Sequence, residues 1–173
     1  MNQSGELIRL LKDQFGEQIV TGIEIGTGPG TITTAILSLP NVTLLYTIDP
    51  YRHVPGAQYE AGSHNQEQHN GAMLHAINRL KPHRGRFIMC LCTSDKAVEF
   101  TASEVDFVWI DGHHTVEQVD HDVRNYWPKV KSGGFIGGHD FGHAGDVRQA
   151  VYDIFDPSEV ELGEDTTWWV FKK

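Results

Sequence analysis

The stretch 22-GIEIGTGPG-30 ends an apolar run and places three glycines, Gly26, Gly28 and Gly30, within five positions. Glycine adopts left-handed backbone conformations at no steric cost and lets a ligand approach the main chain closely. When such a turn opens a helix, its free N–H groups and the helix N-terminus bind polar ligands. The stretch therefore predicts the first strand and ligand-binding turn of an α/β sheet.

Outward from this turn, short apolar runs alternate with helical patterns along most of the chain. Strands are expected at 18–25, 42–48, 86–92, 105–110 and 133–138, with helices at 31–39, 64–80, 94–103, 115–130 and 146–155. An amphipathic helix over 1–16 precedes them, and two strands at 159–163 and 166–172 are close enough to pair antiparallel. This alternation predicts an α/β, Rossmann-like, doubly wound and mostly parallel sheet, with an antiparallel C-terminal strand pair and helices on both faces. The length suits one domain, 1–173.

Composition and charge limit the classes of partner that this protein can be expected to bind. The formal net charge of −9 and the lack of a basic stripe argue against nucleic acid. No apolar run reaches the length of a membrane span, and the N-terminus lacks a signal-peptide pattern, so we expect a cytoplasmic protein without a membrane partner. Cys90 and Cys92 alternate within one apolar run and are expected to be buried thiols.

The second expected strand ends in Asp49, where a carboxylate can accept hydrogen bonds from both hydroxyls of a ribose. A nucleoside triphosphate is excluded, because no Gly-Lys-Ser/Thr follows the glycines. A dinucleotide is disfavoured, because the spacing is G-x-G-x-G and Glu24 would repel a pyrophosphate. The same carboxylate suits a ligand with an ammonium or sulfonium group, and an NAD-dependent dehydrogenase is the least favoured function.

Three segments, 20-VTGIEIGTGPG-30, 46-YTIDP-50 and 105–141, resemble class I S-adenosylmethionine (SAM)-dependent methyltransferases. More narrowly, "IDGHH", the paired glycines and "HD" in 105–141 resemble the signature of a small-molecule O-methyltransferase-like group. The resemblance implies that the glycine turn and Glu24 hold the methionine part of SAM and that Asp95 and Ser94 lie beside the adenine. The cofactor-binding residues implied are Glu24, Gly26, Gly28, Gly30, Asp49, Ser94, Asp95 and Asp111.

Carboxylates and imidazoles follow the fourth and fifth expected strands, which contribute Asp111, His113, His114, His139 and Asp140. Such a set suits Mg²⁺ or Mn²⁺, and its nitrogen ligands also admit Fe²⁺, Ni²⁺ or Zn²⁺. By resemblance, the metal ligands are Asp111, His139 and Asp140. The catalytic residues are then Asp111, His114 as first choice of general base and His113 as second.

The remaining expectations concern the acceptor and the periphery of the site. The polar segment 50–71 is expected to be a lid, with Tyr51, His53 and Tyr59 as acceptor contacts, and His143 is a further candidate. His121 and Asp122 are expected on the solvated side of their helix. A homodimer would complete the acceptor pocket.

The predicted function is therefore methyl transfer from SAM to a hydroxyl of a small molecule, assisted by a divalent metal and a histidine base. Two alternatives stay open. One is a SAM-binding protein without catalysis, and the other is a metal-dependent hydrolase or hydroxylase on the same scaffold. The sequence does not identify the acceptor, and a nitrogen or carbon nucleophile is not excluded.

Overall fold

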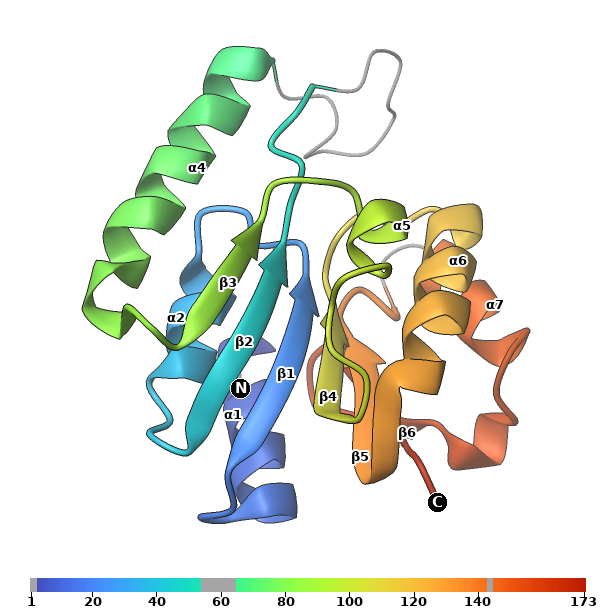
Figure 1. Cartoon of the computed structure of the whole chain (residues 1–173). Coiled ribbons are helices and arrows are strands. Elements are labelled where there is room, and N and C mark those ends of the chain that lie inside the picture. Colours follow the sequence, from blue (N-terminus) through green and yellow to red (C-terminus); the bar gives the residue numbers. More distant parts are fainter. Residues whose placement is uncertain (1–2, 54–64, 143–144) are drawn as a thin grey trace.

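A seven-stranded sheet in the order β3-β2-β1-β4-β5-β7-β6 forms the centre of the fold (Figure 1). The computed structural model describes residues 3–53, 65–142 and 145–173. The strands are β1 (Val20–Ile25), β2 (Val42–Ile48), β3 (Phe87–Cys90), β4 (Val105–Ile110), β5 (Val130–Gly138), β6 (Glu161–Leu162) and β7 (Trp168–Phe171). β1 to β5 pair in parallel, and β7 is antiparallel to both β5 and β6.

Helices cover both faces of this sheet (Figure 1). One face carries α1 (Gln3–Phe15), α2 (Thr31–Leu37) and α4 (Gln66–Leu80), and the other carries α5 (Ser94–Ala97), α6 (Val116–Tyr126) and α7 (Gly145–Tyr152). Short 3-10 turns complete the described elements at η1 (Lys81–His83), η2 (Trp127–Lys129) and η3 (Pro157–Glu159). The predicted doubly wound fold, including its antiparallel C-terminal pair, is confirmed.

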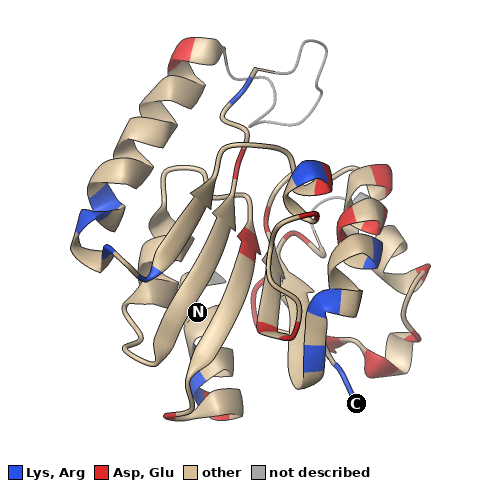
Figure 2. Ribbon diagram, viewed as in Figure 1, with Lys and Arg blue, Asp and Glu red and all other residues tan. Residues whose placement is uncertain are grey.

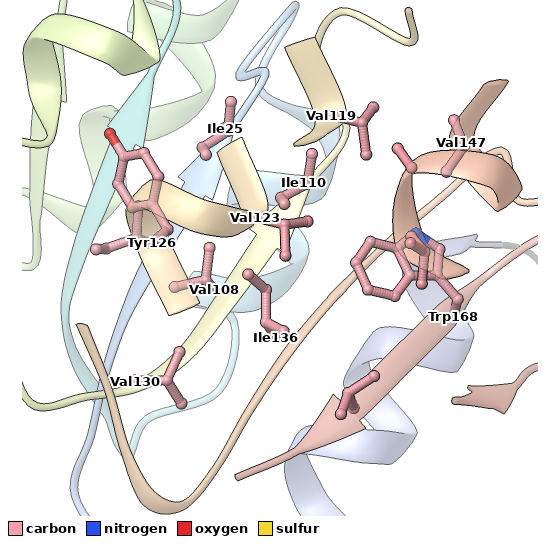
Figure 3. Packing of buried hydrophobic residues seen from close by; sticks show 14 of the residues in the cluster. Ile25, Val108, Ile110, Val119, Val123, Tyr126, Val130, Ile136, Val147 and Trp168 are labelled. Carbon is pink, nitrogen blue, oxygen red and sulfur yellow. The ribbon is translucent and has the colours of Figure 1, made fainter. Parts of the chain in front are cut away.

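The core consists of two apolar layers, one on each side of the sheet. Figure 3 shows Val108 and Ile110 of β4 beside Val119 and Val123 of α6, in the layer under α6 and α7. The alternate β4 side chains, Phe107 and Trp109, belong to the opposite layer, beneath α1 and α2. β4 is buried on both faces, which explains why its sequence is almost continuously apolar.

The topology places a crevice between β1 and β4. From β1 the chain winds outward through β2 and β3, and from β4 it winds the other way through β5. Helices after β1 and β2 lie on one face and those after β4 and β5 on the other, so the loops separate where β1 and β4 adjoin. Ligands bind to doubly wound sheets at the carboxyl ends of the strands at this switch point.

Several predicted boundaries need correction. α4 begins at Gln66, because Asn65 accepts a hydrogen bond from the N–H of Gln68 in a capping box. Residues 66–71 are therefore helix rather than lid, while the part of the predicted lid at 54–64, with Tyr59, lies outside the described residues. The helix expected over 94–103 is only the single turn of α5.

The described part of the chain also bears on the membrane prediction. None of its helices is both long and apolar enough to cross a bilayer.

Candidate functional site

A cavity of about 720 Å³ opens at the carboxyl ends of β1, β2 and β4. Its wall combines the glycine turn, the segment after β2, the start of α5, the loop after β4 and one side of α6. The residues from these elements include Gly26, Thr27, Gly28, Asp49, Tyr51, Arg52, Ser94, Asp111, His113, Gln118 and Asp122. The cavity thus lies at the switch point of the sheet, as the strand order leads one to expect.

The glycine turn takes a shape that side chains would prevent. Gly26 has φ +96°, and a Cβ built on it would lie 2.1 Å from the main-chain oxygen of Asp111. Gly28 has φ +48°, and its N–H donates to Asp49 Oδ2 at 2.9 Å. The turn therefore packs directly against the loop after β4, and the cavity wall is main chain at this point.

Asp49 connects the first two strand ends. Besides the bond to the Gly28 N–H, its Oδ1 accepts from the N–H of Tyr51 at 2.8 Å. Tyr51 has φ +44°, which is unusual for an aromatic residue, and its hydroxyl donates to the Gly28 carbonyl at 2.8 Å. Burial raises the pKa of Asp49, and the bonds from Tyr51 and Gly28 oppose that rise. Tyr51 is itself buried and lines the cavity. Its hydroxyl stabilises the glycine turn through the bond to the Gly28 carbonyl.

Glu24 lies beneath the turn rather than on the cavity wall. Its Oε2 accepts from the hydroxyls of Thr33 at 2.6 Å and Thr47 at 2.7 Å. Full burial raises the pKa of Glu24 to about 8, although both hydroxyls lower it. This position suits a residue that supports the turn from below. Gly30 is likewise absent from the wall, since it packs on Ala76 of α4.

A polar trio forms the wall where α5 meets α6. The Gln118 Nε2 donates to Ser94 Oγ at 3.3 Å and to Asp122 Oδ1 at 3.1 Å. Asp122 is 1% exposed, and its Oδ2 has no hydrogen-bond partner among the described residues. Burial raises the pKa of Asp122 to about 6. Asp122 thus places a buried carboxylate at the cavity wall.

The trio corrects one expectation, because Asp122 is buried and is not on the solvated side of α6. The implied adenine contact Asp95 is exposed and is not among the residues that line the cavity, and its role stays a prediction. The missed signal was helical spacing: Asp122 stands between Val119, Val123 and Tyr126 on one stripe, whose apolar members point into the core in Figure 3. A polar residue inside a buried stripe requires a polar partner.

A second cluster lies where β4 and β5 end. Ligand atoms of Asp111, His139 and Asp140 all lie within 4.8 Å of one another. His114 Nε2 lies 3.2 Å from Asp140 Oδ2 and 3.7 Å from Asp111 Oδ1. Asp140 has φ +62°, an unusual conformation that turns the chain directly after β5. Asp111 also lines the cavity, so the cluster and the cavity share a residue.

The two neighbouring histidines have opposite pKa shifts. Burial lowers the pKa of His114, but its interactions with Asp111 and Asp140 outweigh burial and the net pKa is raised. Burial and the adjacent His114 lower the pKa of His113, which lines the cavity. His114 is thus held by carboxylates, whereas His113 faces the cavity. The candidate His143 lies outside the described residues.

Solved methyltransferases share this fold. CalS11, a calicheamicin methyltransferase, matches with a TM-score of 0.73 at 11% identity, over 95% of this chain and 77% of its own. An rRNA methylase from Streptococcus thermophilus matches with a TM-score of 0.64 at 9% identity, over 95% and 91%. A precorrin-6y C5,15-methyltransferase from Geobacter metallireducens matches with a TM-score of 0.65 at 15% identity, over 97% and 88%. At these identities the likeness shows the fold alone.

Comparison by sequence identifies the family. A search of curated proteins finds no match. A family described as a methyltransferase domain matches residues 23–141, more than half of the chain, from β1 to the loop after β5. That region contains the glycine turn, Asp49, the polar trio and the Asp111–His139–Asp140 cluster. The chain belongs to the methyltransferase domain family.

Proposed function

We propose that this chain transfers a methyl group from SAM to a hydroxyl of a small molecule, with help from a divalent metal. The observation that carries the proposal is the position of Asp111, which both lines the cavity and belongs to the Asp111–His139–Asp140 cluster. A methyl donor in the cavity would then lie beside a group that can activate an acceptor. Simple storage or sensing of SAM does not require that arrangement.

SAM fits the cavity by its chemistry, and membership of a methyltransferase family implies it as donor. SAM supplies an electrophilic methyl group. The exposed main chain of the glycine turn suits its methionine part, and Asp49 suits the ribose hydroxyls. We assign the adenine amino group to the Ser94, Gln118 and Asp122 trio, because all three residues line the cavity and Asp122 offers a carboxylate there.

The metal proposal rests on the donor set. Two carboxylates and one imidazole suit Mg²⁺ or Mn²⁺, and the imidazole also admits other transition metals. Such a metal supplies Lewis-acid stabilisation of an oxyanion. Asp111, His139 and Asp140 would hold it.

His114 is the proposed proton acceptor, with His113 as the alternative. The pair of carboxylates beside His114 Nε2 favours its protonated form, so a proton taken from an acceptor hydroxyl is stabilised there. His113 has the lowered pKa of a neutral base and lies on the cavity wall. The variants His114→Asn and His113→Asn distinguish the two, because only the loss of the true base should reduce kcat with little effect on SAM affinity.

The class of acceptor follows from charge and from one structural neighbour. One CalS11 structure is described as a TDP-rhamnose 3'-O-methyltransferase, which supports a sugar hydroxyl as acceptor. Figure 2 shows Lys and Arg residues dispersed over several elements instead of gathered on one face in that view, and the net charge is −9. Both observations favour a small molecule over the nucleic acid that an rRNA methylase modifies.

The decisive test is transfer of labelled methyl from SAM to a panel of hydroxylated sugars and phenols, with Mg²⁺, with Mn²⁺ and with EDTA. We expect turnover with metal and a loss of at least tenfold with EDTA or in Asp140→Asn. Asp153→Asn, which changes an exposed carboxylate on the surface, is the control. SAM binding without turnover on any acceptor would favour the non-catalytic alternative. Metal binding without SAM binding would favour the hydrolase or hydroxylase.

A further inference from the structure

The two ring nitrogens of His139 have different partners. Nδ1 lies 3.2 Å from Asp140 Oδ1, on the side of the carboxylate cluster. Nε2 lies 3.0 Å from the hydroxyl oxygen of Thr166. The ring is therefore held between a carboxylate and a hydroxyl from a different part of the chain.

Thr166 reaches His139 because of the antiparallel end of the sheet. β7 pairs with β5 so that Trp168 lies opposite Gly138, which directly precedes His139. The N–H of Phe141 also donates to the carbonyl oxygen of Thr166 at 3.0 Å. Main-chain pairing on both sides of His139 and Asp140 thus places the main chain of Thr166 beside the cluster.

A neutral imidazole carries one proton, so one nitrogen donates and the other accepts. Without a metal, Asp140 is the stronger acceptor and favours the proton on Nδ1. To ligate a metal through Nδ1, the ring must carry its proton on Nε2 instead. A hydroxyl can donate to Nε2 in the first state and accept from it in the second, whereas an apolar side chain can do neither.

We propose that Thr166 is a positioning residue, whose hydroxyl keeps the His139 ring in place and accommodates either tautomer. The inference rests on the proposed metal site and adds a residue to it. Metal-ligating histidines generally donate their second ring N–H to a protein or water acceptor, and loss of that acceptor typically costs roughly 10–100-fold in metal affinity. In this chain Thr166 supplies that acceptor.

The test compares wild type, Thr166→Val and Thr166→Ser by calorimetric titration of Mn²⁺ without acceptor. We expect Thr166→Val to weaken Mn²⁺ binding roughly 10–100-fold and Thr166→Ser to keep it within about threefold of wild type. Thr43→Val, at an exposed position of β2, is the control for the same chemical change. Thermal melting of each variant shows that the fold is retained.

A second readout needs no transition metal. Nitrogen NMR of ¹⁵N-histidine-labelled protein, with the ring neutral, should show His139 protonated on Nδ1 and accepting at Nε2, and protonated on Nε2 when Mg²⁺ is added. In Thr166→Val the hydrogen-bonded Nε2 signal should shift, and in Thr166→Ser it should not.

The two proposals fail in different ways. If wild type binds no metal, the metal proposal fails, and the metal-free NMR spectra alone decide the role of Thr166. Unchanged His139 nitrogen shifts and unchanged Mn²⁺ affinity in Thr166→Val would overturn the positioning role.

Discussion

At the scale of single residues, the site contains buried carboxylates whose surroundings oppose their ionisation. Glu24 and Asp122 are both nearly inaccessible to solvent, and burial raises both pKa values. Such groups reduce the stability of the fold in exchange for a role in binding or in shaping a turn. Their effects on stability and on binding can therefore be measured separately.

Asp122→Asn should stabilise the protein and weaken SAM binding. The variant removes a buried charge, so the gain in stability should be near zero well below pH 3.8, grow as pH rises through about 6, and be complete above it. Loss of the charged acceptor should weaken SAM by about tenfold, or 1.4 kcal/mol. Thermal melts at pH 5 and 8 and calorimetry of SAM test this. A variant that melts higher but binds SAM as tightly as wild type would remove Asp122 from the adenine site.

Glu24 gives the fold a pH dependence of its own. Its folded pKa of about 8 exceeds the ordinary 4.5, so its contribution to stability is complete below 4.5 and is lost as pH rises through 8. The difference corresponds to at most about 5 kcal/mol. Glu24→Gln removes the titratable group, so it should remove most of this pH dependence of stability. The amide oxygen of Gln can still accept from the hydroxyls of Thr33 and Thr47. Denaturant unfolding from pH 5 to 9 measures it, and parallel curves for variant and wild type would contradict the assignment.

At the scale of elements, the turn from β1 to α2 depends on backbone conformations that only glycine tolerates well. Gly26→Ala should destabilise the fold by about 3 kcal/mol or more and abolish SAM binding, because its Cβ would collide with Asp111 main chain. Gly85 has a similar φ of +85° with nothing within 4 Å of its Cβ. Gly85→Ala should therefore cost only about 1–2 kcal/mol, and equal unfolding energies for the two variants would argue against the collision.

The accuracy with which the sequence predicts the type and bounds of a helix or strand differs from one element to another. β4 and α6 follow clear apolar periods, so their type and approximate bounds were predicted correctly. α5 was predicted too long, because its single turn is followed by residues whose apolar spacing continues a helical pattern. Local spacing indicates that a helix is compatible with a segment, but it does not determine where the helix ends.

At the scale of the whole molecule, SAM would join segments that lie far apart in the chain. The cavity wall combines residues from the β1 turn, the β2 end, α5, the β4 end and α6. SAM at a hundredfold excess over its Kd should therefore raise the free energy of unfolding by about 2.7 kcal/mol.

Asp49→Ala tests that linkage. It removes the carboxylate that bonds the N–H groups of Gly28 and Tyr51, so at the same SAM concentration most of the stabilisation should disappear. Thermal shift assays with a SAM dilution series measure this. A full thermal shift in Asp49→Ala would show that Asp49 does not contribute to nucleoside binding.

The sequence by itself determined the fold class, the glycine turn, and the placement of Asp49, Asp111 and Asp140 at the ends of strands. These features depend on local periodicity and on backbone conformations available only to glycine, which are encoded over a few residues. Only the tertiary structure decided that Asp122 faces the cavity while Asp95 faces solvent, that Glu24 lies beneath the turn, and that Thr166 contacts His139. Those outcomes depend on how helices rotate against the sheet and on β7 inserting between β5 and β6, which are set by packing between distant segments.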